Sequence, residues 1–193
     1  MRNSLTILGA GSSAGTPVVG CKCSTCLSDN PRNKRTRCSS IVTLKNGKNI
    51  LIDTSPDLRE QSLRESIVSV DAVLFTHAHA DHCHGIDDLR AFCQLNKKQI
   101  PLYGNKFVMD QLVEKFKYAM IEPKNFWELP VLKPNIVDGP FKIFEEIITP
   151  IPVMHGKSQI NGYRIGNLAY ITDTSEISEK SMKLLDGIDV LLI

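Results

Sequence analysis

The chain has 193 residues, of which 42% are hydrophobic and 23% are charged, and its formal net charge is +2. This composition is ordinary for a globular protein of one domain, here 1–193, and the small charge favours neither an acidic nor a basic partner. Because no apolar run approaches the roughly 20 residues that cross a bilayer, we expect no membrane segment. The N-terminal residues make a poor signal peptide, so we expect a cytoplasmic protein with reduced cysteines.

The first half of the chain predicts mainly strands. The expected elements are a strand at Ser4–Gly9, a Cys-containing loop at about 16–38, a hairpin at Ile41–Lys45 and Asn49–Thr54, a helix at Pro56–Glu65 and a strand at Asp71–Thr76. Asn46-Gly47 in the hairpin is a strong turn signal, and Ser55 is a candidate N-cap of the helix. The apolar run DAVLFT is typical of a strand buried on both faces.

The second half of the chain predicts helices and then strands. The expected elements are helices near 87–96 and 105–119, strands at Phe141–Phe144, Ile147–Val153, Gly162–Ile165 and Leu168–Thr172, a helix near 178–185 and a strand at Asp189–Ile193. We expect one apolar helix side with Phe107, Leu112, Val113 and Phe116. Grouped strands and helices indicate an α+β fold with helices outside a sheet core. Because DVLLI reads as a central strand but ends the chain, we expect a truncated domain.

Four of the five histidines lie in the segment THAHADHCHG, residues 76–85. His77, His79, Asp81 and His82 form the pattern H-x-H-x-D-H. In an extended segment, residues two apart point the same way, so His77 and His79 can converge on one cation. Asp81 and His82 can then turn toward a second position. Neutral imidazoles and carboxylates suit zinc, manganese or iron. A run of surface histidines is the alternative, and the density of ligands favours a metal site.

This segment resembles the defining motif of the metallo-β-lactamase fold, a superfamily of metal-dependent hydrolases. The resemblance implies a four-layer αββα sandwich, here lacking its last strands and helix. It also implies two divalent metals at the active site, zinc or manganese. By the same resemblance, Asp53 at the end of NILIDT supports the site by accepting the second N–H of a ligand histidine.

The resemblance also distributes the ligands between the two metals. The first metal would take His77, His79 and His155. The second would take Asp81 and His82, with Asp173 shared between the metals. Relatives normally supply one more histidine near the C-terminus, but no histidine follows His155 in this chain. We therefore expect the second metal to bind more weakly.

Longer stretches narrow the resemblance to one branch of the superfamily. LGAGSSAGTPVVGCKCSTC, HADHCHGIDDLR and HGKSQINGYRIGNLAYITD are similar to the cyclic-phosphate phosphodiesterases of the carbon–phosphorus lyase pathway and their relatives. The nucleases that process tRNA 3′ ends are more distant neighbours. The resemblance therefore implies a small phosphate ester as substrate and makes nucleic acid a less favoured partner. A homodimer is an open alternative.

Cys21, Cys23 and Cys26 form the pattern C-x-C-x-x-C. Three thiolates at this spacing can hold one face of a tetrahedral zinc. The resemblance implies a structural zinc knuckle that a C-terminal histidine completes. Here Cys38 or water could take that place, or the loop could be free of metal. Cys83 and Cys93 are expected to be packing residues, because a buried free cysteine behaves as a small hydrophobe.

Several other side chains are candidates for substrate contact. His84 could protonate a leaving alcohol, touch the substrate or have a structural role, and Arg90 could bind substrate. Asp87 and Asp88 are expected to cap the following helix. The basic cluster at 32–37 is either a solvated loop or a phosphate contact. Gly9, Gly11 and Ala14 fit a loose dinucleotide pattern, but no helix follows them, so tight turning near the metals is the better interpretation.

We therefore predict a metal-dependent hydrolase, namely a phosphodiesterase that cleaves a small linear or cyclic phosphate ester. A metal lowers the pKa of bound water, so metal-bound hydroxide would be the nucleophile, with Asp81 and His84 as catalytic residues. Two alternatives stay open. One is a thioesterase or lactonase on the same fold, and the other is a truncated metal-binding remnant with little activity. Nothing in the sequence specifies the substrate, the choice between zinc and manganese, or the oligomeric state.

Overall fold

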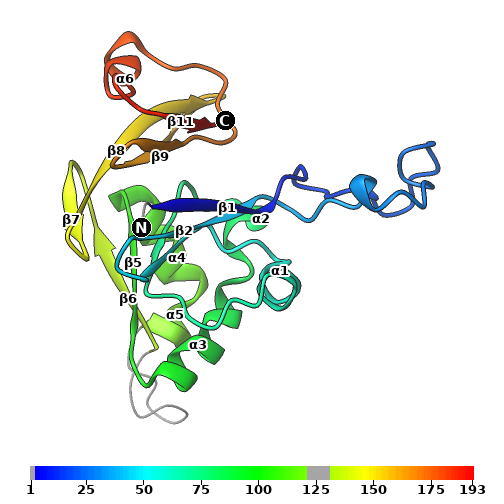
Figure 1. Ribbon diagram of the computed structural model, residues 1–193, viewed down its shortest axis with the longest axis horizontal. Coiled ribbons are helices and arrows are strands. Elements are labelled where there is room, and N and C mark those ends of the chain that lie inside the picture. Colours follow the sequence, from blue (N-terminus) through cyan, green and yellow to red (C-terminus); the bar gives the residue numbers. More distant parts are fainter. Residues whose placement is uncertain (1–2, 121–130) are drawn as a thin grey trace.

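The computed structural model, described for residues 3–120 and 131–193, contains two β-sheets that face each other (Figure 1). The first sheet has the order β1-β2-β3-β4-β5-β6, with strands β1 (Ser4–Gly9), β2 (Ser39–Thr43), β3 (Asn49–Ile52), β4 (Ala72–Leu74), β5 (Ile100–Gly104) and β6 (Leu132–Ile136). The second has the order β11-β10-β9-β8-β7, with strands β7 (Phe141–Ile143), β8 (Glu146–His155), β9 (Ser158–Ile165), β10 (Leu168–Tyr170) and β11 (Val190–Leu192).

Both sheets contain parallel and antiparallel strand pairs. β1, β2 and β3 pair antiparallel, whereas β3, β4, β5 and β6 pair parallel. The second sheet is antiparallel except for its β10–β11 pair. Parallel neighbours present their carboxyl ends at the same sheet edge, so the segments that follow β3 and β4 emerge side by side.

Alternation along the central strands builds a core on each face of the first sheet. Ile50 and Ile52 of β3 pack toward the second sheet, in a cluster that includes Ile148 and Tyr163. Leu51, between them, packs into the other cluster with the helices. Successive strand residues point to opposite faces, and here both faces are covered. This explains why NILI and DAVLFT are continuously apolar.

Helices cover the outer face of each sheet. On the first sheet lie α1 (Leu58–Arg64), α3 (Leu89–Asn96), α4 (Lys106–Lys115) and α5 (Lys117–Met120). α6 (Glu179–Lys183) lies beside β8 of the second sheet, over a small cluster that contains Ile151, Val153 and Leu185. The order helix, sheet, sheet, helix confirms the predicted αββα sandwich. Within the described residues, no helix combines the length and apolar character needed to span a bilayer.

Two strands of the first sheet were absent from the sequence prediction. β5 and β6 each contain a proline, Pro101 and Pro134, and proline argues against a strand because it cannot donate to the ladder. Both strands form nevertheless, and β5 pairs parallel with β4 and with β6. Tertiary pairing has overridden the local preference.

The predicted helix at 105–119 is divided and its apolar side is incomplete. α4 ends at Lys115, Phe116 occupies the C-cap position, and α5 follows. Leu112 is fully buried, but Phe107 is 66% exposed. The prediction that Phe107 shares one helix side with Leu112 was therefore wrong, because helical rotation carries its ring away from the side occupied by Val108 and Leu112.

The predicted helix caps also needed correction. α1 has Asp57 as N-cap, and the hydroxyl of Ser55 accepts the N–H of Asp57 at 3.1 Å instead of capping the helix. Asp88 stands at the N-cap position of α3 without a capping side-chain hydrogen bond. Asp87 pairs with Arg90 at 2.6 Å and accepts the hydroxyl of Tyr118 at 2.8 Å. Ser55 and Asp87 do not cap helices because their side chains bond to other groups, Ser55 in a local turn and Asp87 with Arg90 and Tyr118.

β11 lies at the end of its sheet and pairs parallel with β10. Val190 and Leu191 are 44% and 43% exposed. Within the described residues β11 is therefore an edge strand, although its sequence resembles the central strand DAVLFT.

The loop between β1 and β2 projects from the body of the molecule as a long arm (Figure 1). The arm contains the short 3-10 helix η1 (Pro31–Asn33). At the base of the arm the two chain segments pass very close, since a Cβ at Gly9 would lie 2.0 Å from the carbonyl oxygen of Arg37. Glycine is therefore required there by close backbone approach.

Candidate metal centre

The candidate ligands emerge from strand ends of both sheets. Asp53 follows β3, and His77 to His82 follow β4 and include the short helix α2 (Ala80–Cys83). His155 is the last residue of β8, and Asp173 follows β10. Asp53 and Asp173 have positive φ values of 60° and 51°, so each lies where the chain turns sharply out of a strand. The fold thus gathers residues from four separate segments.

The first group consists of His77, His79 and His155. Their candidate ligand atoms all lie within 4.8 Å of one another, and His77 Nε2 is 3.1 Å from His79 Nδ1. His77 is buried, His79 is exposed and His155 is intermediate. Three imidazole nitrogens that converge with one side open to solvent suit a divalent cation with room for a further ligand.

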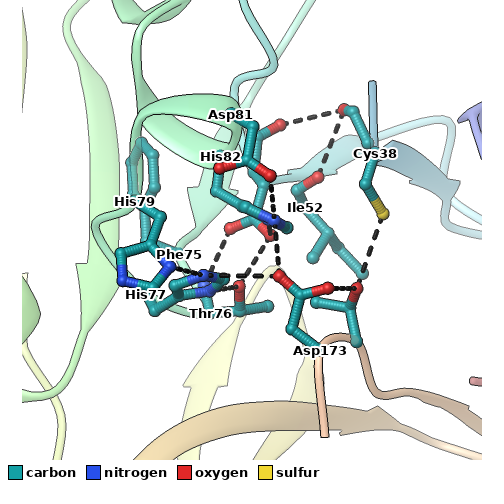
Figure 2. Close-up of polar contacts among 12 residues, drawn as sticks. Cys38, Ile52, Phe75, Thr76, His77, His79, Asp81, His82 and Asp173 are labelled. Carbon is teal, nitrogen blue, oxygen red and sulfur yellow. Dashed lines mark hydrogen bonds and ion pairs between the residues drawn. The ribbon is translucent and has the colours of Figure 1, made fainter. Parts of the chain in front are cut away.

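The second group adjoins the first and includes His77, His82 and Asp173 (Figure 2). Asp173 Oδ2 lies 2.9 Å from His82 Nε2 and 3.5 Å from His77 Nε2. Asp81 Oδ2 lies 3.3 Å from His82 Nε2. Asp173 therefore belongs to the second group and also approaches His77, the residue that the two groups share.

A buried hydrogen-bond network fixes two of these histidines. Asp53 Oδ1 accepts the N–H of Thr76 at 2.8 Å, and Asp53 Oδ2 accepts the Thr76 hydroxyl at 2.7 Å. The Thr76 oxygen also lies 2.9 Å from His77 Nδ1. Since Thr76 has given its only hydroxyl proton to a carboxylate, it must accept the N–H of His77 Nδ1. His77 Nε2 is left with its lone pair toward the metal groups.

Asp53 orients His82 in the same way. His82 Nδ1 lies 2.8 Å from Asp53 Oδ2, and both side chains are fully buried. A proton on Nδ1 leaves Nε2 as the ligand atom. This is the geometry that the expected supporting role of Asp53 requires. Thr76 belongs to the same network, although it had been read only as the end of a strand; its place directly before the first histidine was the available signal.

The titration of these groups reflects burial and neighbouring charge. Burial lowers the pKa of His77 to about 4, helped by the positive charge of His82. Burial also disfavours charged His82, but the carboxylates of Asp53 and Asp173 outweigh it and raise its pKa to about 11. The adjacent His82 imidazolium lowers the pKa of Asp173 to about 2. In the absence of a metal, the second group therefore holds a positive charge between carboxylates.

The residues present fit a metal. His82 Nε2 is buried and has no hydrogen-bond partner of suitable geometry among the described residues, although two carboxylate oxygens lie close. Burying a polar atom without a partner is costly. A divalent cation at this position would take the place of the proton on Nε2 and satisfy the atom. The nitrogen and oxygen donors suit zinc or manganese.

The three arm cysteines also converge. Cys21, Cys23 and Cys26 have their sulfur atoms within 4.8 Å of one another. The N–H of Cys26, followed by contact with Cys21, lowers the pKa of the Cys23 thiol to about 7. Cys38 does not complete this set, because its sulfur lies 3.0 Å from the hydroxyl of Tyr170. Cys83 and Cys93 are buried, as predicted for packing residues.

The remaining candidates contact residues outside the metal groups. His84 is exposed and contacts Phe116 edge-on, with ring centroids 5.9 Å apart. Arg90 pairs with Asp87. Arg37 of the basic cluster is held by Asp57 through a 2.6 Å ion pair. The catalytic role of His84 and the substrate contact of Arg90 stay predictions.

Comparison with known proteins agrees with this architecture. Residues 48–193 match the family described as "Beta-lactamase superfamily domain". The chain therefore belongs to the β-lactamase superfamily and has its metallo-β-lactamase fold.

Particular relatives are also similar to this chain. A crystal structure described as a new diphosphatase from the PhnP family is 40% identical with a TM-score of 0.89, over 98% of this chain and 73% of that one. An octanoyltransferase of Porphyromonas gingivalis is 39% identical over 97% of this chain, but the match spans 38% of that protein. Zinc-bound PqqB from Methylobacterium extorquens is 20% identical, with a TM-score of 0.77 over 98% and 71% of the two chains, and shows the shared fold alone.

Proposed function

We propose that this chain is a metal-dependent hydrolase that cleaves a small phosphate ester, linear or cyclic, as a phosphodiesterase. The observation that carries the proposal is the convergence of His77, His79 and His155 beside His82 and Asp173, with His77 common to both sets. Two adjacent divalent sites of this kind suit displacement at phosphorus, since attacking and departing oxygens can each be stabilised.

Each group of side chains would hold one metal. His77, His79 and His155 would hold the first, and Asp81, His82 and Asp173 the second, with Asp173 shared. When bound, divalent metals polarise phosphoryl oxygens and acidify a water ligand. Asp53 and Thr76 keep the ligand nitrogens of His77 and His82 aimed at the site. Loss of either support would leave the imidazoles free to rotate.

The site can attract an anionic substrate only when metal cations are bound, because the side chains around His82 are carboxylates. Asp81 and Asp173 lie beside His82, and buried Asp53 lies behind it. Without bound cations these carboxylates would repel a phosphodiester. His84, on the turn that follows α2, is our candidate for giving a proton to the departing oxygen.

The diphosphatase relative supports phosphate chemistry in particular. It is 40% identical, and this chain spans 73% of it. A diphosphatase breaks a phosphorus–oxygen bond, as a phosphodiesterase does, so the same metal arrangement serves both reactions. Diphosphate esters therefore belong in the substrate panel.

A second candidate is hydrolysis of an acyl ester or thioester. The observation in its favour is the 39% identity to an octanoyltransferase. Because that match spans only 38% of the relative, the acyl-transfer activity can reside in the part that this chain does not match. We therefore rank acyl substrates second.

The test is a substrate panel with protein reconstituted in zinc or in manganese. We expect the wild type to hydrolyse bis(p-nitrophenyl) phosphate and the double variant Asp81→Ala/His82→Ala to lose this activity. The control variant Asp110→Asn, at an exposed position of α4, should keep full activity. Undiminished phosphodiester turnover in the double variant would contradict the proposal. Turnover of p-nitrophenyl octanoate or octanoyl-CoA alone would favour the acyl candidate. No turnover by metal-loaded, folded protein would favour an inactive remnant.

A further inference from the structure

A cavity of about 140 Å³ opens directly beside the first histidine group. His77, His79 and His155 form one wall of it. The other walls come from α4 and from the hairpin between β8 and β9, and are formed by Phe107, Val108, Gln111, Ser158, Gln159 and Ile160. Whatever binds at the first metal position must extend past these side chains or into solvent.

The chemistry of the walls is neutral. Val108 and Ile160 are 2% and 3% exposed and give the cavity an apolar base. Gln111, Ser158 and Gln159 contribute amides and a hydroxyl. No lysine, arginine, aspartate or glutamate belongs to the described lining. A charged group packed against these walls, away from the histidine wall, would lose water without gaining an ionic partner from them, which is unfavourable.

Phe107 is the side chain with the clearest ligand-binding geometry. It is 66% exposed and lines the cavity beside the first histidine group. Asn105 fixes the start of α4 by accepting the N–H of Val108 at 2.9 Å. At the other end of the helix, Lys115 donates to the carbonyl oxygen of Ala78 at 2.6 Å. α4 is thus tied to the segment between His77 and His79, which fixes the backbone position of Phe107 relative to the metal ligands.

We propose that this cavity receives one uncharged ring of the substrate, with Phe107 against its face, so that Phe107 determines specificity. The inference rests on the proposed function and adds the class of group attached to the phosphate. An engineered protein cavity of about 150 Å³ admits one benzene molecule, so the volume suits a single ring. Gln111 and Gln159 can hydrogen-bond to neutral substituents on that ring.

A binding experiment tests the subsite without turnover. Zinc-reconstituted protein is titrated by calorimetry with phenylphosphonate, methylphosphonate and 4-carboxyphenylphosphonate. We expect phenylphosphonate to bind about 10-fold more tightly than either of the others, since one aromatic contact has about this strength. Phe107→Ala should remove that advantage and leave methylphosphonate binding unchanged, while Phe107→Tyr should keep it. Leu63→Ala, a control on α1 with a 65% exposed side chain, should behave as the wild type.

Kinetics then separate this inference from the proposed function. p-Nitrophenyl phenyl phosphate and bis(p-nitrophenyl) phosphate both carry an uncharged ring, so Phe107→Ala should raise KM for either ester about 10-fold with little change in kcat, and Leu63→Ala should change neither parameter. Equal affinity for phenyl and methyl probes, or equal effects of Phe107→Ala and Leu63→Ala, would overturn the subsite. Preserved discrimination in binding with no hydrolysis of either ester would overturn the phosphodiesterase proposal and leave the subsite standing.

Discussion

Asp53 Oδ2 and His82 Nδ1 lie 2.8 Å apart although the residues are 29 positions apart in the chain. The contact forms because β3 and β4 are parallel neighbours, so the residues after them share one edge of the sheet. Both side chains are fully buried. The carboxylate therefore acts on the candidate ligand in a setting where it has no competition from water.

Asp53→Asn should weaken metal binding by about 10–100-fold, the usual effect of losing a carboxylate that supports a ligand histidine. The amide has one acceptor oxygen, so it cannot replace all three hydrogen bonds that Asp53 accepts from Thr76 and His82. Zinc affinity is measured by competition with a chromophoric chelator. Asp110→Asn should retain the affinity of the wild type, and an unchanged affinity in Asp53→Asn would show that Asp53 does not support the metal.

Thr76→Val should lower zinc affinity by about 10-fold, because valine keeps the shape of threonine but cannot accept the N–H of His77 Nδ1. Thr76→Ser should restore most of the affinity, since it keeps the hydroxyl. The same competition assay applies, with circular dichroism to verify folding. If serine and valine variants lose affinity equally, the hydroxyl is not the group that orients His77.

The arm cysteines predict a metal site separate from the histidine groups. Replacing Cys21, Cys23 and Cys26 together with serine should remove about one equivalent of zinc, since three converging thiolates suit a tetrahedral zinc ion with one further ligand. Elemental analysis of dialysed protein measures the loss. Replacing buried Cys93 with alanine is the control and should leave the zinc content unchanged. Equal zinc content in the triple-serine variant and the wild type would exclude the site.

Asp71 predicts a loss of stability in acid. Burial raises the pKa of this carboxyl, but the N–H of Asn49 and the ammonium groups of Lys98 and Lys48 outweigh it, so the pKa lies below its ordinary value of 3.8. A pKa lowered by folding adds stability above the unfolded value, and that stability is lost as the pH falls through the folded value. The free energy of unfolding should therefore decrease below about pH 4.

Asp71→Asn isolates this contribution. It should lower the free energy of unfolding by about 2 kcal/mol near neutral pH, the scale of hydrogen bonds to a charged group. It should also flatten the acid dependence of stability, which urea titrations from about pH 7 to about pH 3 would measure. Asp138→Asn, an exposed control, should preserve the wild-type dependence. A parallel loss of stability in Asp71→Asn and wild type would contradict the assignment.

The sequence was sufficient to identify candidate metal ligands and to predict the sandwich. The H-x-H-x-D-H pattern is local, and its ligand types and spacing survive any folding of the rest of the chain. The continuous apolar run DAVLFT predicted a strand with both faces covered, because alternation is lost when neither face meets water. The hairpin around Asn46-Gly47 was predicted for an equally local reason.

Other features depended on tertiary contacts. β5 and β6 form despite their prolines because neighbouring strands supply the pairing. Thr76 belongs to the site because its hydroxyl donates to Asp53, which follows β3 and is distant in sequence. Phe107 was predicted to lie on one apolar helix side with Leu112, and the position of α4 placed it beside a cavity instead.

The sequence by itself determined which side chains can bind a metal, since this depends on the chemistry of imidazole, carboxylate and thiolate groups and on short spacings along the chain. Only the tertiary structure decided which of these side chains lie close together, which nitrogens of His77 and His82 face the site, and which residues line the cavity beside it. Those properties arise from contacts between residues far apart in sequence, such as His77 with Asp173, and no local pattern encodes the distance between them.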